Sequence, residues 1–579
     1  MIALARAEAY LLGKVFIGEQ FHHMNSFLIA PGWAYLSGCI LNVDIISRYG
    51  IGIVILWANM TKLLGGFSYE HIYTLMMAGC IIYFLIAYIF LRIWIKSFAI
   101  ALAAILVAIK VQMFFTMSFP QPLTYASGTP IRMIFDMIFM IFIWCHLRKG
   151  QWVYLWLSAG TCAVALFYMT ETGVYLMAAF YVYLVLRCAV EHWREEMIVR
   201  PLDWLKLALC AVMVPAGAFG LLWAFMGKIA WTADFYRNAG EFAKYFTSGL
   251  FMGPFYGGLK YGQFWDLAIG MLFPFVYVLS MGIIGALCIM RRLPKEHLMV
   301  VVLCIYGLGM LHYYIYMSTS NNYYMRGIPF VCVIFYWVTQ GLSLLQEQQR
   351  RYAKLALVFC CAYSLWTNHH YLAYPNILNF SKNPMIDPLV AETLPDRTGY
   401  FYHKVRNYPE EKKLPLNSLG EKDEGLLTER DFSSDEELKA YYRKEINFSR
   451  DVQLIQAQSA PREAVALISS FEAEILIQAE RKPFFYYFSL FASHPMRMRN
   501  FGTVDIFSPL QVDKLIAQLE QRPLAPLFIE KILLSKGVPA SYQYEHPALM
   551  ALLGYVKAHY EPVAYGQYLV ALKRKEGLI

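Results

Sequence analysis

Residues 72–91 read IYTLMMAGCIIYFLIAYIFL, twenty consecutive residues without a charged side chain. A helix needs about 20 mostly apolar residues to cross the hydrocarbon core of a bilayer, so this stretch predicts a membrane span. Comparable runs recur as far as residue 371, and 58% of the 579 residues are hydrophobic while only 16% are charged. We therefore predict a polytopic α-helical membrane protein. Its ten candidate spans are 72–91, 98–118, 131–147, 152–170, 173–190, 203–226, 268–290, 298–317, 327–345 and 354–371.

The composition changes near residue 375, and the last part of the chain is typical of a soluble domain. Residues 375–579 contain 25 basic and 26 acidic residues and no cysteine, whereas residues 1–374 contain 25 basic and 15 acidic residues and all 11 cysteines. The excess of positive charge therefore belongs to the membrane part, and it does not indicate a nucleic-acid partner. We predict a C-terminal α/β domain over 375–579, a usual domain size. The expected strands are 463–468, 484–489, 525–529 and a pair in 562–575, and the expected helices are 472–479 and 511–519.

The charges of the connections predict the orientation. Alternate connections between the spans carry 14 Lys and Arg residues on one side and 5 on the other, and the richer side is expected in the cytoplasm. Counting crossings then places residues 1–71 and residues 375–579 outside the cytoplasm, on either side of a transmembrane helical domain over 72–371. Segment 50–66 must then not cross, and we expect an amphipathic helix in the outer interface.

An external loop at residue 19 needs a span before it, and residues 1–18 carry Arg6, Glu8 and Lys14. Either these residues form a weak first helix or the true start lies upstream, and we expect the second.

The segment before the first span holds the densest set of titratable groups. Glu19 is followed by paired histidines, His22 and His23, then by Ala30-Pro31, Gly38, Asp44 and Ser47-Arg48-Tyr49-Gly50. This order and spacing resembles the first external loop of bacterial GT-C glycosyltransferases, relatives of the protein O-mannosyltransferases and of the lipid A aminoarabinose transferase. Over roughly residues 15–375 the further matches are Thr129-Pro130-Ile131-Arg132, Glu171-Thr172-Gly173, Tyr313-Tyr314 and Ser320-Asn321-Asn322.

The resemblance implies a transferase of the bacterial inner membrane that takes a sugar from a polyprenyl-phosphate carrier. The acceptor would be an extracytoplasmic glycan, lipid or protein. Its hydroxyl needs a carboxylate to remove the proton, and the leaving phosphate needs cationic donors. We assign Glu19 as the candidate base and Asp44 as a base or second carboxylate. The residues expected to bind substrate are His22, His23, Arg48, Tyr49, Arg132, Glu171, Asn321 and Asn322.

Several of these residues have a simpler interpretation. Asp44 could cap the following helix or pair with Arg48, and Glu171 could be a carboxylate merely exposed at a turn. The two histidines could bind zinc, but no third ligand lies nearby in sequence, so we predict no cofactor and leave a divalent metal open.

Lys110 and Asp136 lie inside consecutive spans, where a charge is costly and marks either function or a partner. We expect them to pair with each other. A carrier-phosphate site at Lys110 is the alternative.

Two other function classes remain open. A transporter or flippase of lipid-linked glycans would also be polytopic with intramembrane charge, but it should show internal repeats and broken helices, and neither is clear in this sequence. A non-enzymatic subunit of envelope assembly would need no carboxylate in the first loop. The long segment 227–267, rich in glycine and aromatic residues, is expected to be a functional external loop.

The orientation predicts the outcome of a fusion experiment. A reporter that is active only in the cytoplasm, fused after residue 579, should give no signal, because the tail domain is expected outside. The same reporter fused in the connection 148–151, which carries Arg148 and Lys149, should be active. A strong signal from the C-terminal fusion would contradict the orientation.

Overall fold

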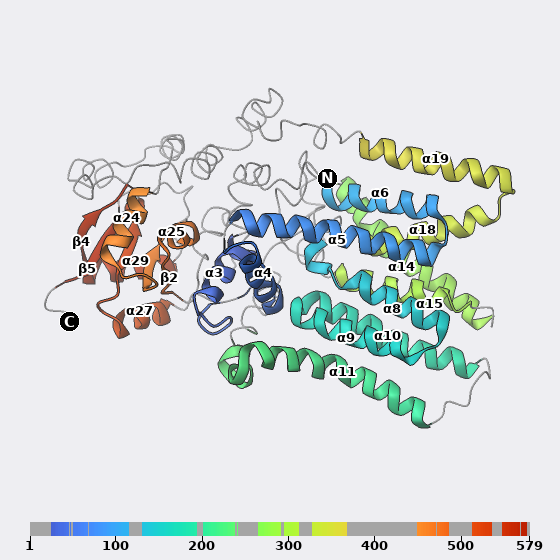
Figure 1. Ribbon diagram of the computed structural model, residues 1–579, viewed down its shortest axis with the longest axis horizontal. Helices are drawn as coiled ribbons and strands as arrows, with labels where there is room; N and C mark the ends of the chain where they lie inside the picture. The colour runs from blue at the N-terminus through green and yellow to red at the C-terminus, as the bar shows by residue number, and fades with distance from the viewer. Residues whose placement is uncertain are drawn as a thin grey trace.

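The computed structural model describes residues 25–45, 47, 50–67, 69–114, 130–193, 201–237, 240, 264–290, 294–311, 327–366, 449–469, 472–485, 512–534, 547–567 and 569–575. Among these residues each of the ten predicted spans coincides with one helix, and Figure 1 shows the helices side by side in a bundle. They are α5 (Tyr69–Ile95), α6 (Phe98–Phe114), α8 (Asp136–Lys149), α9 (Trp152–Tyr168), α10 (Thr170–Trp193), α11 (Pro201–Met226), α14 (Phe264–Ile289), α15 (His297–Met310), α18 (Ile328–Ser343) and α19 (Glu347–Trp366).

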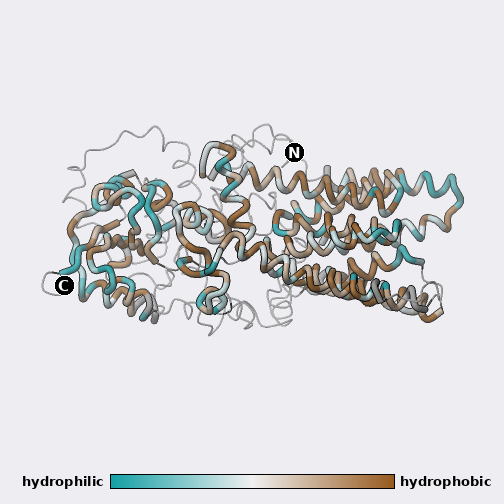
Figure 2. The backbone as a smooth tube through the Cα atoms, turned by 60° about the horizontal axis from the view of Figure 1, so that its bottom comes forward, coloured by the Kyte–Doolittle hydropathy of each residue, from teal (hydrophilic) through white to brown (hydrophobic). Residues whose placement is uncertain are grey.

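Five apolar helical stretches in the described part are long and apolar enough to cross a membrane by length and composition. They are Thr74–Ile95, Pro130–Lys149, Thr170–Ala189, Asp203–Trp231 and Met271–Ile289. Figure 2 shows apolar residues along the bundle, with polar residues gathered at the end that is farthest from the tail domain. The predicted polytopic α-helical class is therefore confirmed.

The segment before the first span folds into short helices that lie between the bundle and the tail domain (Figure 1). They are the π-helix η2 (Asn25–Ile29), α3 (Ala30–Leu36) and α4 (Ile51–Leu63). At ~1.5 Å per residue α4 is about 20 Å long, which is shorter than the hydrocarbon core of a bilayer. Eight of its 13 residues are buried, because α4 packs against α3, α5 and α9. The helix expected over 50–66 is thus present, but it is buried more than a helix lying on a surface would be.

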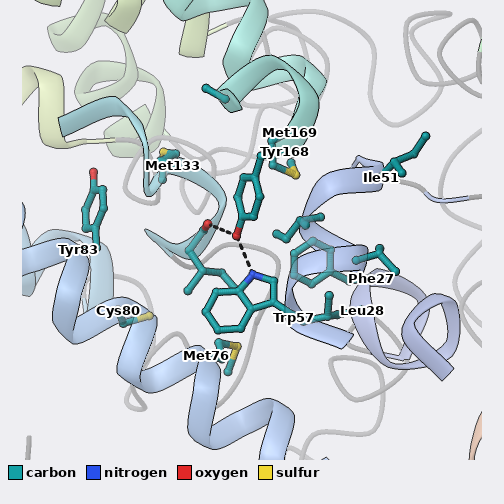
Figure 3. Packing of buried hydrophobic residues seen from close by; sticks show 14 of the residues in the cluster. Phe27, Leu28, Ile51, Trp57, Met76, Cys80, Tyr83, Met133, Tyr168 and Met169 are labelled. Carbon is teal, nitrogen blue, oxygen red and sulfur yellow. Dashed lines mark hydrogen bonds between the residues drawn. The ribbon is translucent and has the colours of Figure 1, made fainter. Parts of the chain in front are cut away.

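The first-loop helix α4 is joined to the bundle by a short chain of buried hydrogen bonds. Trp57 Nε1 donates to the Tyr168 hydroxyl at 2.7 Å, and that hydroxyl donates to the carbonyl of Ile131 at 2.9 Å. Figure 3 shows the indole and the phenol meeting between α4, the end of α9 and the short 3₁₀ helix η4 (Pro130–Met133). Trp57 and Tyr168 are both 3% exposed, so neither group has water as a substitute partner.

Two glycines of the sequence motifs allow the close packing around this chain. Gly50 has φ +147°, and a Cβ there would lie 2.6 Å from the carbonyl oxygen of Tyr168. A Cβ on Gly173 would lie 2.2 Å from the Cα of Leu166, where α10 begins against the end of α9. A larger residue at either place would push the first loop or α10 away from the turn between α9 and α10.

The tail domain is a five-stranded mixed sheet with helices, as the sequence predicts. The strand order is β2-β1-β3-β5-β4, in which β2, β1 and β3 are parallel and β3, β5 and β4 are antiparallel. The strands are β1 (Ala464–Ile468), β2 (Lys482–Pro483), β3 (Leu527–Glu530), β4 (Tyr560–Tyr565) and β5 (Leu569–Arg574). The helices are α24 (Ser449–Gln458), α25 (Glu472–Ala479), α27 (Val512–Gln521), α28 (Lys531–Leu534) and α29 (Pro547–His559).

Most predicted elements of this domain coincide with observed ones. The strand expected at 463–468 is β1, whose residues Val465 to Ile468 are all fully buried. Helix 472–479 is α25, 511–519 is α27, and the pair in 562–575 is β4 and β5. The strand expected at 484–489 is displaced, because β2 ends at Pro483 and residues 486–489 lie outside the described residues.

We predict that Tyr168→Phe destabilises the folded protein. The change leaves the indole N–H of Trp57 and the carbonyl of Ile131 buried without this hydroxyl, and a buried polar group that loses its partner costs about 1–3 kcal/mol. Thermal unfolding of the detergent-purified protein measures the loss. Tyr154→Phe is the matched control, because its hydroxyl only accepts an exposed hydrogen bond from Lys149. Equal midpoints for the two variants would contradict the proposed importance of the Tyr168 hydroxyl.

Candidate functional site

Three of the predicted site residues, Asp44, Arg132 and Glu171, are described by the structure. The others lie outside the described residues, and their roles stay predictions: Glu19, His22, His23, Arg48, Tyr49, Asn321 and Asn322.

Arg132 and Glu171, 39 residues apart in sequence, form an ion pair. Arg132 Nη2 lies 2.9 Å from Glu171 Oε2, and the two side chains are 6% and 23% exposed. Arg132 belongs to η4, and Glu171 lies in the first turn of α10. The nearby Thr172 hydroxyl contacts the carbonyl of Arg132 at 3.4 Å and that of Met169 at 3.1 Å. Glu171 is therefore not merely exposed at a turn, since its carboxylate neutralises a buried guanidinium.

The site is assembled where three distant segments meet. The turn between α9 and α10 contributes Glu171, η4 contributes Arg132, and the Tyr168 hydroxyl bonds to Ile131 directly before Arg132. The beginning of α4 touches the same turn, since Gly50 approaches the Tyr168 carbonyl. The sequence motifs that contain Gly50, Arg132 and Glu171 thus converge on one region of the fold.

Asp44 closes a tight turn of its own in the first loop. Its Oδ2 accepts the backbone N–H of Ile40 at 2.8 Å, and its side chain is exposed. Asn42 has φ +63°, a conformation that asparagine tolerates better than most residues, and its N–H donates to the Ile45 carbonyl at 2.6 Å. The N-cap residue of α4 is Gly50, and no side chain caps that helix. The interpretation of Asp44 as a cap of the following helix is therefore wrong, and the carboxylate remains accessible.

The predicted pair of Lys110 and Asp136 does not form, because each group has a different partner. Lys110 Nζ donates to the carbonyl of Ser364 at 2.6 Å, across the contact between α6 and α19. Asp136 is 1% exposed, and its Oδ2 lies 3.0 Å from the hydroxyl of Tyr306 and 3.4 Å from that of Tyr83. The helices that pack against α8 supply these phenols, and phenolic hydrogen bonds stabilise a carboxyl group without a second charge. The alternative of a carrier phosphate at Lys110 stays a prediction.

A metal site is not evident among the described residues, where no group of three or more His, Cys, Asp or Glu side chains is arranged to hold an ion. The paired histidines lie outside those residues.

No protein-family model and no curated protein matches the chain. Among solved structures, the chain is similar to ArnT from Cupriavidus metallidurans bound to undecaprenyl phosphate. The identity is 12%, the TM-score is 0.44, and the match covers 100% of this chain and 97% of ArnT. For the apo state of that protein the values are 12%, 0.46, 99% and 96%. The Archaeoglobus fulgidus oligosaccharyltransferase, in complex with Zn and sulfate, has 14% identity and a TM-score of 0.36, with 91% of this chain and 68% of that chain covered.

We predict that Arg132 and Glu171 are coupled in stability. Arg132→Met leaves a carboxylate next to an apolar chain, and Glu171→Gln leaves a guanidinium that is 6% exposed without its counter-charge. Residues in one ion-pair network show coupling energies of about 0.5–3 kcal/mol, so the double variant should recover part of the folded yield that either single variant loses. Fluorescence-detected gel filtration measures that yield.

The control for this cycle is the pair of Arg237 and Asp234, which are 58% and 67% exposed at 3.1 Å. Exposed pairs contribute about 0–1 kcal/mol, so Arg237→Met and Asp234→Asn should change the yield little. Losses that simply add in the double variant of Arg132 and Glu171 would contradict their coupling.

Proposed function

We propose that this chain is a membrane glycosyltransferase of the GT-C type. It moves a sugar from a polyprenyl-phosphate carrier to an extracytoplasmic glycan, lipid or protein of the cell envelope. The observation that carries the proposal is the ion pair of Arg132 and Glu171 at the place where the first loop meets the helix ends. This pair puts a buried cation and a carboxylate on the side of the bundle that we propose to be external.

The arrangement of the chain supports this orientation. The tail domain and the first-loop helices lie at one end of the bundle, and the connection between α18 and α19 lies at the opposite end (Figure 1). That connection leads into Arg350, Arg351 and Lys354, which the positive-inside rule places in the cytoplasm. We propose a multi-pass protein of the bacterial inner membrane, with residues 1–71 and 375–579 outside the cytoplasm.

The reaction needs a base for the acceptor hydroxyl and a cation for the leaving phosphate. Glu19 is the proposed base, and the exposed Asp44 is a second carboxylate of the same loop. Arg132 is the proposed phosphate ligand, because a guanidinium makes short charge-assisted bonds to phosphate oxygens and has five N–H donors. Its pairing with Glu171 fixes the direction of the guanidinium before the donor binds, which reduces the reorganisation that the reaction requires.

The direct test is turnover by the purified full chain. The donors are undecaprenyl-phosphate-linked sugars of several kinds, and the acceptor is a cell-envelope extract. Mass spectrometry follows the release of undecaprenyl phosphate that depends on the acceptor. Movement of the intact lipid-linked sugar between leaflets of a vesicle, without cleavage of the carrier bond, would indicate a transporter instead.

We predict that Glu19→Gln lowers turnover by about 10²–10⁴-fold, the usual contribution of a general base. Donor binding should persist, because the amide keeps the shape and hydrogen bonding of the side chain. Glu19→Asp should retain part of the activity, since the shorter carboxylate can still accept the proton. Asp44→Asn is the comparison within the same loop. If Glu19→Gln turns over normally and Asp44→Asn is inactive, the base is Asp44. If both variants are fully active, the proposed transferase mechanism is wrong.

A further inference from the structure

The tail domain touches the first loop at the beginning of β2. Trp33 of α3 donates its indole N–H to the backbone carbonyl of Arg481 at 3.1 Å, across 448 residues of sequence. Figure 1 shows β2 on the side of the tail domain that is nearest to α3. The C-terminal domain is therefore in direct contact with the segment that carries the candidate carboxylates.

The carbonyl that receives this hydrogen bond is held firmly by its own domain. Arg481 is 4% exposed, and its guanidinium donates to the hydroxyl and the carbonyl of Ser459 and to the carbonyl of Ala479, each at 2.8 Å. The next residue, Lys482, is fixed by the β-sheet, because its N–H donates to the Glu463 carbonyl at 2.9 Å. The position of the Lys482 backbone is thus set by α24, α25 and β1.

The ammonium group of Lys482 reaches the turn that Asp44 closes. A Cβ on Gly38 would lie 3.8 Å from Lys482 Nζ, and Gly38 has φ +92°. Burial raises the pKa of the Cys39 thiol to about 11, Asp44 adds to the rise, and Lys482 opposes it. A cation from the tail domain and an anion from the first loop thus act on the same half-buried thiol, which places both of them at this turn.

We propose that Lys482 is a positioning residue. The tail domain carries it to the turn of residues 38–45, and its charge and contact hold that turn so that the exposed Asp44 carboxylate keeps its place beside the acceptor. The role of Asp44 in this proposal rests on the proposed transferase function, whereas the docking of the domain and the ordering of the turn do not.

A photo-crosslinking amino acid at position 482 tests the docking in the full chain. Irradiation of the purified protein should link position 482 to residues 33–44, and mass spectrometry of the digested protein identifies the joined peptides. The control carries the same amino acid at Lys557, which is an exposed residue of α29 in the same domain. Links from position 482 to the first loop that do not exceed those from position 557 would overturn the docking.

Hydrogen exchange tests the positioning without any assay of activity. The turn is held by the N–H of Ile40 bonded to Asp44 Oδ2 and the N–H of Asn42 bonded to Ile45. The ammonium group of Lys482 lies at this turn, so Lys482→Met should speed exchange in the peptide 38–45 by about two- to fivefold. Lys482→Arg should restore the slow exchange, and Lys557→Met should leave it unchanged. Unchanged exchange in Lys482→Met would overturn the positioning role, even if the cross-link forms.

Turnover then shows whether the ordered turn matters for the reaction. Lys482→Met should lower kcat by about two- to fivefold with little change in the KM for the donor, and Lys482→Arg should recover it. An unchanged kcat would overturn the catalytic part of the proposal. A wild-type protein that turns over none of the donors would instead overturn the proposed function, while the cross-link and the exchange data would still decide the docking and the positioning.

Discussion

The close contact between α4 and the turn that joins α9 to α10 determines how the rest of the candidate site is arranged. This contact adds to the packing of α4 against α5, and it joins the first loop to the end of α9. The Tyr168 hydroxyl is at the centre, because it accepts from Trp57 and donates to Ile131 while it is 3% exposed. A hydroxyl has one donor hydrogen and two acceptor lone pairs, so this single atom can join the loop helix, the turn and η4 at once. Arg132 follows Ile131 directly, and the same hydrogen bond therefore helps to fix the guanidinium that pairs with Glu171.

The positions of the membrane-part helices were predictable because one physical effect dominates there. The cost of exposing backbone and charge to lipid forces long apolar helices, and residues 72–91, 203–226 and 268–289 fall within α5, α11 and α14. In the tail domain the continuous apolar run of β1 is typical of a strand buried on both faces, and the sheet confirms it. Helix α29 was missed because its sequence, PALMALLGYVKAH, lacks a distinct apolar periodicity. Helix α24, SRDVQLIQAQ, was missed although its apolar residues do gather on one face.

The partners of polar groups were less predictable than the elements that carry them. Lys110 and Asp136 were expected to pair because they lie inside consecutive spans, but the order of the spans does not show which faces of the helices meet. The presence of Tyr83 and Tyr306 inside the spans could have indicated the partners of Asp136, since a phenol inside an apolar span also needs a hydrogen-bond partner. No sequence pattern indicates the contact between Trp33 and Arg481, since it depends on how the C-terminal domain docks against the first loop.

The pairing of Arg132 with Glu171 explains how a cation can be kept at a place that is otherwise apolar. An isolated guanidinium that is 6% exposed would carry a large desolvation cost. That cost would favour unfolding of the loop or the binding of an anion. A carboxylate at 2.9 Å offsets part of this cost. The pairing therefore lets a buried guanidinium be kept in the folded protein, at the end of the bundle where the first-loop helix α4 meets the turn between α9 and α10.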